Sequence, residues 1–84
     1  MNKKLPLPGE IYEHYKGGTY KIICLSVHTE TQEKLVIYKS INFGSIFARP
    51  LEQFLEDVEI EVSSGSKINV ARFRMTHYSP ISEI

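Results

Sequence analysis

A Gly-Gly turn between two tyrosine-bearing segments constrains the fold of this chain more than any other feature. Glycine tolerates positive φ angles, so Gly17-Gly18 predicts a two-residue hairpin between a strand over residues 10–15 and a strand over residues 20–28. Side chains alternate along a strand, and one face of the first strand collects groups common in binding sites, namely Tyr12, His14 and Lys16. The chain is therefore expected to begin with an antiparallel ribbon that has a recognition face.

The second strand is apolar on both faces, which predicts a central or strongly curved strand. Strict alternation places Ile22 and Cys24 on one face and Ile23, Leu25 and Val27 on the other. Because Cys24 is the only cysteine and lies in an aliphatic run, it is expected to be a buried, reduced thiol without an internal disulfide. A reduced thiol fits a cytoplasmic protein.

The next segments predict an antiparallel meander followed by a short helix. Residues 35–41 and 46–49 favour strands, joined by a turn over 42–45. Pro50 suits the first helical position, so Arg49-Pro50 predicts a junction between strand and helix. The apolar residues that follow at helical spacing are Leu51, Phe54, Leu55 and Val58.

Many short strands and one short helix in 84 residues predict a mainly β fold. A last hairpin is expected between residues 58–62 and 68–75. The predicted architecture is a small SH3-like, partly open antiparallel β-barrel, with its one short helix after Arg49-Pro50. Three parts are predicted along the chain: a flexible N-terminal segment over 1–8, the barrel domain over 9–75 and a C-terminal tail over 76–84.

Composition and charge disfavour several classes of protein. The proportions of 42% hydrophobic and 24% charged residues are those of a soluble globular protein. No run approaches the roughly 20 apolar residues that cross a membrane, and residues 1–8 lack the apolar core of a secretion signal. The net charge is zero, and residues 50–84 carry six acids against three bases, which disfavours non-specific nucleic-acid binding. A cytoplasmic protein without a membrane partner is expected.

Five motifs follow one another along the chain. They are the opening Gly9, Tyr12, His14, Tyr15, Lys16 and Gly17; then His28-Thr29-Glu30-Thr31; Val36-Ile37-Tyr38; Arg49-Pro50 with Phe54; and Arg72-Phe73. In this order they resemble DUF1653, a bacterial domain of unknown function, over most of residues 9–73. Two positions depart from the family pattern, since Phe47 replaces an expected tryptophan and Ala71 an expected proline. The resemblance implies a small SH3-like barrel and no established activity.

Aromatic, basic and acidic side chains of these motifs form a candidate ligand-binding set. Its members are Tyr12, His14, Lys16, His28, Glu30, Tyr38, Arg49 and Arg72. If their strands lie side by side, they offer a phosphate, a carboxylate or a nucleotide a stacking and charge-assisted surface. In the alternative, structural interpretation, the arginines tie strand ends to glutamates and the tyrosines are half-buried packing. The glutamates considered are Glu13, Glu30 and Glu52.

Metal, cofactor and catalytic sites are not predicted. The histidines and the single cysteine lack the paired spacing of a zinc site. Cys24 and His28 lie four positions apart on one strand, roughly 13 Å along its axis, which is too far for a nucleophile and its base. His28 and Glu30 share a face, which permits acid–base chemistry, but this pattern at a strand end is more often a loop anchor. An enzymatic role is disfavoured, and no cofactor is expected.

Two classes of function stay open. The first, which we favour, is an interaction module that binds a peptide, a protein partner or single-stranded nucleic acid through an aromatic and basic surface. The second is a binder of a small anionic ligand such as a nucleotide, or an enzyme accessory domain. A long shallow groove favours the first class, and a closed pocket with convergent polar groups favours the second. An exposed sheet edge also permits a homodimer.

Overall fold

The computed structural model describes residues 3–79, and this part of the chain is mainly β. Its strands are β1 (Glu10–His14), β2 (Thr19–Val27), β3 (Lys34–Ser40), β4 (Ile46–Pro50), β5 (Asp57–Glu61), β6 (Lys67–Ala71) and β7 (Phe73–Tyr78). Its helix is α1 (Leu51–Phe54).

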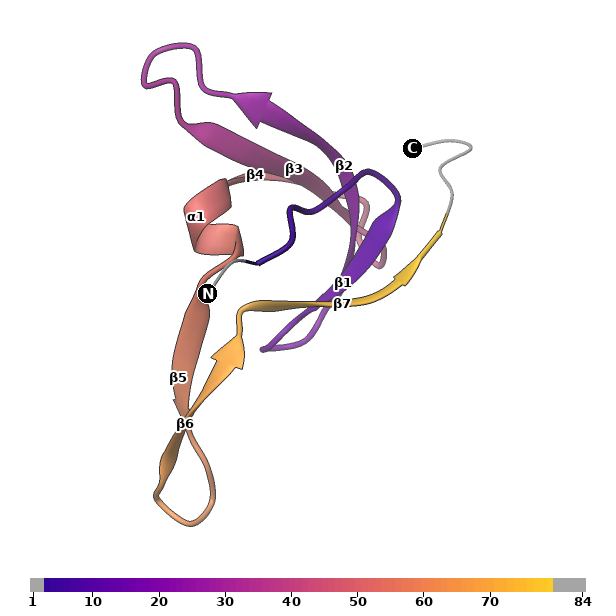
Figure 1. Cartoon of the computed structure of the whole chain (residues 1–84). Helices are drawn as coiled ribbons and strands as arrows, with labels where there is room; N and C mark the ends of the chain where they lie inside the picture. Colours follow the sequence, from indigo (N-terminus) through magenta and orange to yellow (C-terminus); the bar gives the residue numbers. More distant parts are fainter. Residues whose placement is uncertain (1–2, 80–84) are drawn as a thin grey trace.

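Two antiparallel sheets make up the fold. Five strands form one sheet in the order β4-β3-β2-β1-β7, and β5 and β6 form a separate two-stranded ribbon. The larger sheet is strongly curved, with α1 beside it and the ribbon projecting from it (Figure 1). The strands do not close into a full barrel. This open, curved arrangement agrees with the predicted partly open SH3-like barrel.

The core lies between the larger sheet and the short helix. Its buried side chains are Tyr12, Ile22, Val36, Tyr38, Phe54 and Phe73. The rings of Phe54 on α1 and Phe73 on β7 stack with centroids 4.1 Å apart and planes 7° apart. Phe54 is the buried residue of α1, so the helix serves to insert one aromatic ring into the core.

The short helix forms after Arg49-Pro50 as predicted, and it is about one turn long. Pro50 has φ −53° and ψ 136°, so it is the last extended residue before the helix rather than the first helical one. Leu55 caps the helix at its C-terminal end, and Val58 pairs with Val70 in the β5–β6 ribbon. The sequence offers Val58 both to the helical spacing and to the final hairpin, and the structure has it in the hairpin, where pairing with β6 takes the place of a second helical turn.

A β-bulge overturns the predicted faces of β2. The pairing of β2 with β3 shifts between Ile22 and Cys24, so Ile23 is the extra residue. Beyond this point the alternation is reversed: Leu25 packs against the core that holds Ile22, and Cys24 is exposed. The predicted burial of Cys24 is therefore wrong, because strict alternation from Ile22 does not continue through a bulge.

Both predicted hairpins form, with altered boundaries. β1 and β2 pair antiparallel, but residues 15–18 connect them, with Gly17 and Gly18 at φ 106° and 95°. β5 and β6 also pair as predicted, but the expected long final strand is interrupted at Arg72. After this break β7 pairs with β1, which sets Phe73 opposite His14. The interruption therefore brings the end of the domain back to its first strand.

Buried contacts and strand pairing continue on both sides of residues 9–75. Pro6 is among the fully buried residues, and β7 continues to Tyr78. The outermost parts of the predicted N-terminal segment and C-terminal tail, residues 1–2 and 80–84, lie outside the described residues. The limits of the three predicted parts stay a prediction.

Candidate functional site

A small pocket opens where β1, β2, β3, β4 and β7 come together. It has a volume of about 150 Å³ and is lined by His14, Tyr20, Tyr38, Phe47, Arg49 and Phe73. We call it the aromatic–arginine pocket. Four of the six lining residues carry aromatic rings of tyrosine or phenylalanine, and none is acidic. Such a lining suits an anionic group that is carried by an apolar stem.

The curvature of the sheet creates this pocket. β4 and β7 are the two edge strands of the sheet, yet the guanidinium carbon of Arg49 on β4 lies 5.5 Å from the ring centroid of Phe73 on β7. Tyr38 bridges the gap, with its ring centroid 5.6 Å from that of Phe47 and 5.4 Å from that of Phe73. Phe47 and Arg49 lie two positions apart on β4 and so share a face. Two edges of one sheet therefore form a common wall.

Arg49 carries a charge that no carboxylate within residues 3–79 pairs with. Its Nε donates a hydrogen bond to the hydroxyl of Tyr38 at 3.1 Å, and its guanidinium lies over the ring of Phe73. These contacts orient the guanidinium, while its terminal nitrogens donate no hydrogen bond to that part of the chain. The free N–H donors of an oriented guanidinium match the two oxygens of a carboxylate or a phosphate.

His14 forms one side of the pocket. Its ring centroid lies 4.9 Å from that of Phe73 and 4.8 Å from that of Tyr15. Its Nδ1 accepts a hydrogen bond from the backbone N–H of Lys16 at 3.1 Å, which is the arrangement of a neutral imidazole protonated at Nε2. Desolvation first, and then three nearby positive charges, lower the pKa of His14; the charges belong to Arg49, Arg72 and Lys16. The hydrogen bond to Nδ1 and the lowered pKa both favour the neutral imidazole in this cationic setting.

Arg72 and Lys16 lie beside the pocket rather than in its lining. Nη2 of Arg72 donates to the carboxylate of Glu56 at 3.0 Å, while its buried Nε has no hydrogen-bond partner within residues 3–79. The ammonium of Lys16 lies 5.7 Å from the ring centroid of Tyr15. The ion-pair partners that the structural interpretation proposed are not the ones formed, since Arg72 uses Glu56 and Arg49 uses no acid within the described range.

Tyr12, another predicted site residue, lies in the core and does not line the pocket. Its side chain is buried, and its ring meets that of Phe54 edge to face at a centroid distance of 5.2 Å. Its hydroxyl donates a hydrogen bond to Glu10 at 3.1 Å. Burial first, and then the charge of Glu10, raise the pKa of Tyr12, which keeps the hydroxyl protonated. The residue is therefore a packing element with an internal hydrogen bond.

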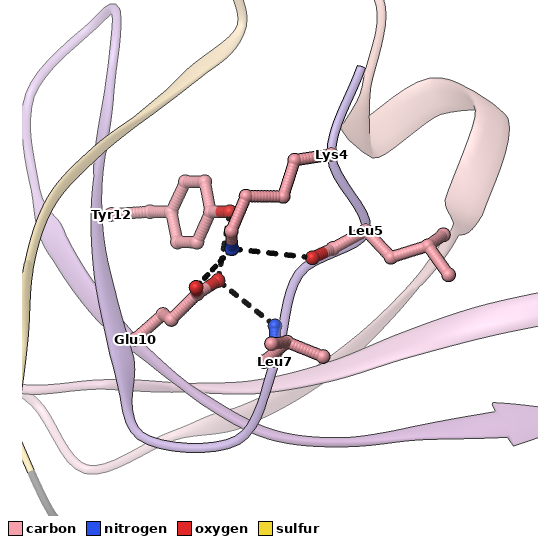
Figure 2. Close-up of polar contacts among 5 residues, drawn as sticks. All are labelled: Lys4, Leu5, Leu7, Glu10 and Tyr12. Atoms are coloured by element: carbon pink, nitrogen blue, oxygen red, sulfur yellow. Dashed lines mark hydrogen bonds and ion pairs between the residues drawn. The ribbon is translucent and has the colours of Figure 1, made fainter. Parts of the chain in front are cut away.

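Glu10 is a buried charge that the candidate set does not contain. Glu10 is only 4% exposed. Figure 2 shows the Lys4 ammonium and the Leu7 backbone N–H converging on its carboxylate, to which the Tyr12 hydroxyl also donates. Burial alone would raise the pKa of Glu10, but these hydrogen bonds and the charge of Lys4 hold it below its usual value. The preceding Gly9 has φ 91°, and a Cβ there would approach the Tyr78 ring to 2.8 Å. This corner therefore fastens the start of the chain to β1.

His28 and Glu30 lie in the loop between β2 and β3, away from the pocket. Nδ1 of His28 accepts hydrogen bonds from the backbone N–H groups of Glu30 at 3.1 Å and Thr31 at 3.3 Å. Tyr20, which lines the pocket, is near the other end of β2, so the long strand separates the two regions by roughly 25 Å. The geometry is that of a loop anchor, and these two residues do not join the other candidates.

Three lining residues of the pocket are absent from the candidate set: Tyr20, Phe47 and Phe73. Tyr20 and Phe47 lie on strands that pair with β3, and their ring centroids are 5.4 and 5.6 Å from that of Tyr38. A search for aromatic residues beside Tyr38 across the predicted strands would find both. Phe73 reaches the pocket only because β7 pairs with β1, and no local sequence signal indicates that pairing.

Two further classes of site were sought in the part of the chain that the structure describes. Within residues 3–79, no group of three or more His, Cys, Asp or Glu side chains is arranged to hold a metal ion. The same range has no helix of the length and apolar character needed to span a membrane.

Comparison with known proteins identifies a family. The model of the family described as protein of unknown function (DUF1653) matches residues 10–75 of this 84-residue chain. No curated protein and no solved structure matches this chain. The matched range contains every residue that lines the aromatic–arginine pocket. The resemblance predicted from the five motifs is confirmed, and the chain belongs to the DUF1653 family of proteins of unknown function.

Proposed function

We propose that this chain is a binding module that receives an acidic side chain of a peptide or protein partner in the aromatic–arginine pocket. The observation that carries the proposal is the state of Arg49, which is partly buried and oriented by Tyr38 and Phe73 but has no carboxylate partner within residues 3–79. Removing a charge from water costs free energy unless an opposite charge compensates it. A carboxylate from a partner would supply that compensation.

The size of the pocket favours one side chain over a complete small ligand. Its volume of about 150 Å³ compares with about 300–1,000 Å³ for pockets that enclose small molecules. A nucleotide would extend well beyond the lining residues. A pocket of this volume holds a single anchoring group, so one side chain is the occupant that fits best.

The surrounding charges favour a peptide or protein over single-stranded nucleic acid. A nucleic acid needs a track of basic groups for successive phosphates. Here Arg72 is already paired with Glu56, and the neighbouring ribbon presents three exposed acids on β5, namely Asp57, Glu59 and Glu61. The Arg49 guanidinium, which has no acidic partner within residues 3–79, matches one anionic group rather than a row of phosphates.

The experiment is a titration followed in the amide NMR spectra of isotope-labelled protein. The probe is the capped peptide acetyl-Gly-Glu-Gly-amide, and its uncharged twin acetyl-Gly-Gln-Gly-amide is the comparison. We expect saturable shifts at the amides of residues that line the pocket, with a millimolar Kd for the glutamate peptide and a Kd at least tenfold weaker for the twin, which corresponds to about 1.4 kcal/mol.

Two variants separate a specific site from general attraction by charge. Arg49→Gln removes the proposed recognition group, whereas Lys39→Gln removes one positive charge from the opposite face of β3. The glutamate peptide should lose its shifts with Arg49→Gln and keep them with Lys39→Gln. Equal shifts from both peptides, or equal losses in both variants, would overturn the proposal.

A further inference from the structure

A second pocket lies against the first and shares His14 with it. It has a volume of about 350 Å³ and is lined on its other sides by Tyr15, Ile60, Val70, Ala71, Glu13 and Arg74. We call it the hairpin pocket, because the β5–β6 hairpin supplies its aliphatic wall. Glu13 and Arg74 form an ion pair with each other, so the two charges in the lining compensate one another. The hairpin pocket therefore selects for apolar rather than charged groups.

The aliphatic wall follows from the pairing register of the ribbon. Val58 faces Val70 and Ile60 faces Ile68 across β5 and β6, which places all four on one face because alternate residues share a face. A two-stranded ribbon is stable only when such a face packs against something. Ile68 is 46% exposed, so the cover over this face is incomplete.

The two pockets are close enough for one short peptide to occupy both. His14 lines both of them, and its ring centroid lies 4.8 Å from that of Tyr15, which lines the hairpin pocket, and 4.9 Å from that of Phe73, which lines the aromatic–arginine pocket. Alternate side chains of an extended peptide lie on the same side and roughly 7 Å apart. Neighbouring side chains point to opposite sides, so they cannot enter both pockets together.

We infer that the partner is an extended peptide segment in which an acidic residue and a large aliphatic residue are separated by one position, with the acid in the aromatic–arginine pocket and the aliphatic side chain in the hairpin pocket. This inference rests on the proposed function. The acid is assigned by the charge of Arg49, which has no acidic partner within residues 3–79. The aliphatic group is assigned by the apolar lining around Ile60 and Val70, where Glu13 and Arg74 compensate each other. Together the two anchors define a motif rather than a single residue.

The test compares four capped peptides by the same NMR titration. The reference is acetyl-Gly-Glu-Gly-Gly-Gly-amide. The two alternate-spacing peptides are acetyl-Gly-Glu-Gly-Leu-Gly-amide and acetyl-Gly-Leu-Gly-Glu-Gly-amide, which cover both chain directions, and acetyl-Gly-Glu-Leu-Gly-Gly-amide has adjacent spacing. We expect one alternate-spacing peptide to bind about tenfold more tightly than the reference, since a leucine side chain leaves water. The adjacent peptide should gain little.

A matched pair of variants locates the aliphatic anchor. Ile60→Thr makes the hairpin pocket polar, and Ile68→Thr makes the same change beside it on the same face of the ribbon, at a residue that does not line the pocket. Threonine keeps the β-branched shape that strands favour, so both variants should retain the ribbon. The gain from leucine should disappear with Ile60→Thr and persist with Ile68→Thr.

The outcomes distinguish a failure of this inference from a failure of the proposed function on which it rests. Provided that the reference peptide binds, three results would overturn the two-anchor motif. They are no added affinity from leucine in either order, as much added affinity at adjacent spacing, or a gain in affinity from leucine that persists in Ile60→Thr. Failure of the reference peptide itself to bind overturns the proposed function.

Discussion

Glu10 and Arg49 are charged residues of the same small domain, and their surroundings differ sharply. The Glu10 carboxylate is buried and receives an ammonium, a backbone N–H and a tyrosine hydroxyl. Within residues 3–79, the Arg49 guanidinium donates one hydrogen bond to an uncharged hydroxyl and lies over an aromatic ring, with no carboxylate partner. A buried charge whose partners are complete ties chain segments together, whereas an oriented charge without a counter-charge retains free energy that a ligand can use. By this criterion Glu10 is a structural residue, and Arg49 is the residue for which we propose a binding role.

The largest expected effect is on stability, and it should fall on Glu10. Glu10→Ala leaves the Tyr12 hydroxyl buried without an acceptor and frees the segment that carries Lys4, so the free energy of unfolding should fall by about 3 kcal/mol. Arg49→Gln loses one hydrogen bond and one cation–π contact, and should cost about 1 kcal/mol. Urea unfolding of both variants measures the two losses. If Arg49→Gln were the more destabilising change, the contrast between the two charges would not hold.

The second effect is on the acid end of the stability profile. The pKa of Glu10 is lower in the folded state, so its ionised form stabilises the fold at pH values above the unfolded value of about 4.3. That stabilisation is lost as the pH falls from there through the lower folded value. Unfolding measured across the acid range should therefore show a smaller loss for Glu10→Gln than for the unmodified chain. Lys39→Gln, which removes a charge from the opposite face of β3, is the control and should keep the original acid dependence.

Much of the fold could be predicted from local chemistry. Gly17-Gly18 and Pro50 mark their turns by backbone restriction alone, and both hairpins and the strand-to-helix junction form near the predicted positions. The exposure of Cys24 could not be predicted in the same way. The bulge at Ile23 depends on how β2 curves against β3, which is a property of the assembled sheet and not of the strand's own alternation.

The site shows the same division between local and long-range information. Of the candidate set, His14, Tyr38 and Arg49 meet in the aromatic–arginine pocket, because the predicted strands and their alternation place them on one face. Phe73 could not be foreseen there, since the chain must break at Arg72 and return to β1. His28 shares the imidazole chemistry of His14 but lies in a distant loop. The residue types identify candidate site residues, but the pairing of strands that are remote in sequence decides which of the candidates lie together.

The smallest expected effect links binding at Arg49 to the protonation of His14. Three positive groups surround the imidazole: Arg49 from β4, Arg72 between β6 and β7, and Lys16 after β1. Desolvation and then these charges lower the pKa of His14 in the folded, ligand-free protein. As the pH falls below about 6.5, the imidazole is therefore protonated in the unfolded state at a higher pH than in the folded state. A bound carboxylate would offset those charges and raise the pKa of His14 again. Binding of an acidic peptide should therefore be accompanied by proton uptake.

The measurement is the Kd of acetyl-Gly-Glu-Gly-amide at about pH 8 and about pH 6, where the peptide carboxylate stays ionised and His14 is the group whose charge changes with binding. The unmodified chain should bind severalfold more tightly at the lower pH, because the imidazolium adds a second positive charge at the pocket wall. His14→Gln keeps a hydrogen-bonding side chain but cannot titrate, so its affinity should be the same at both values. An affinity of the unmodified chain that does not change with pH would mean that the bound acid lies beyond the reach of the imidazole, and would move the anion away from the wall that His14 shares with Phe73.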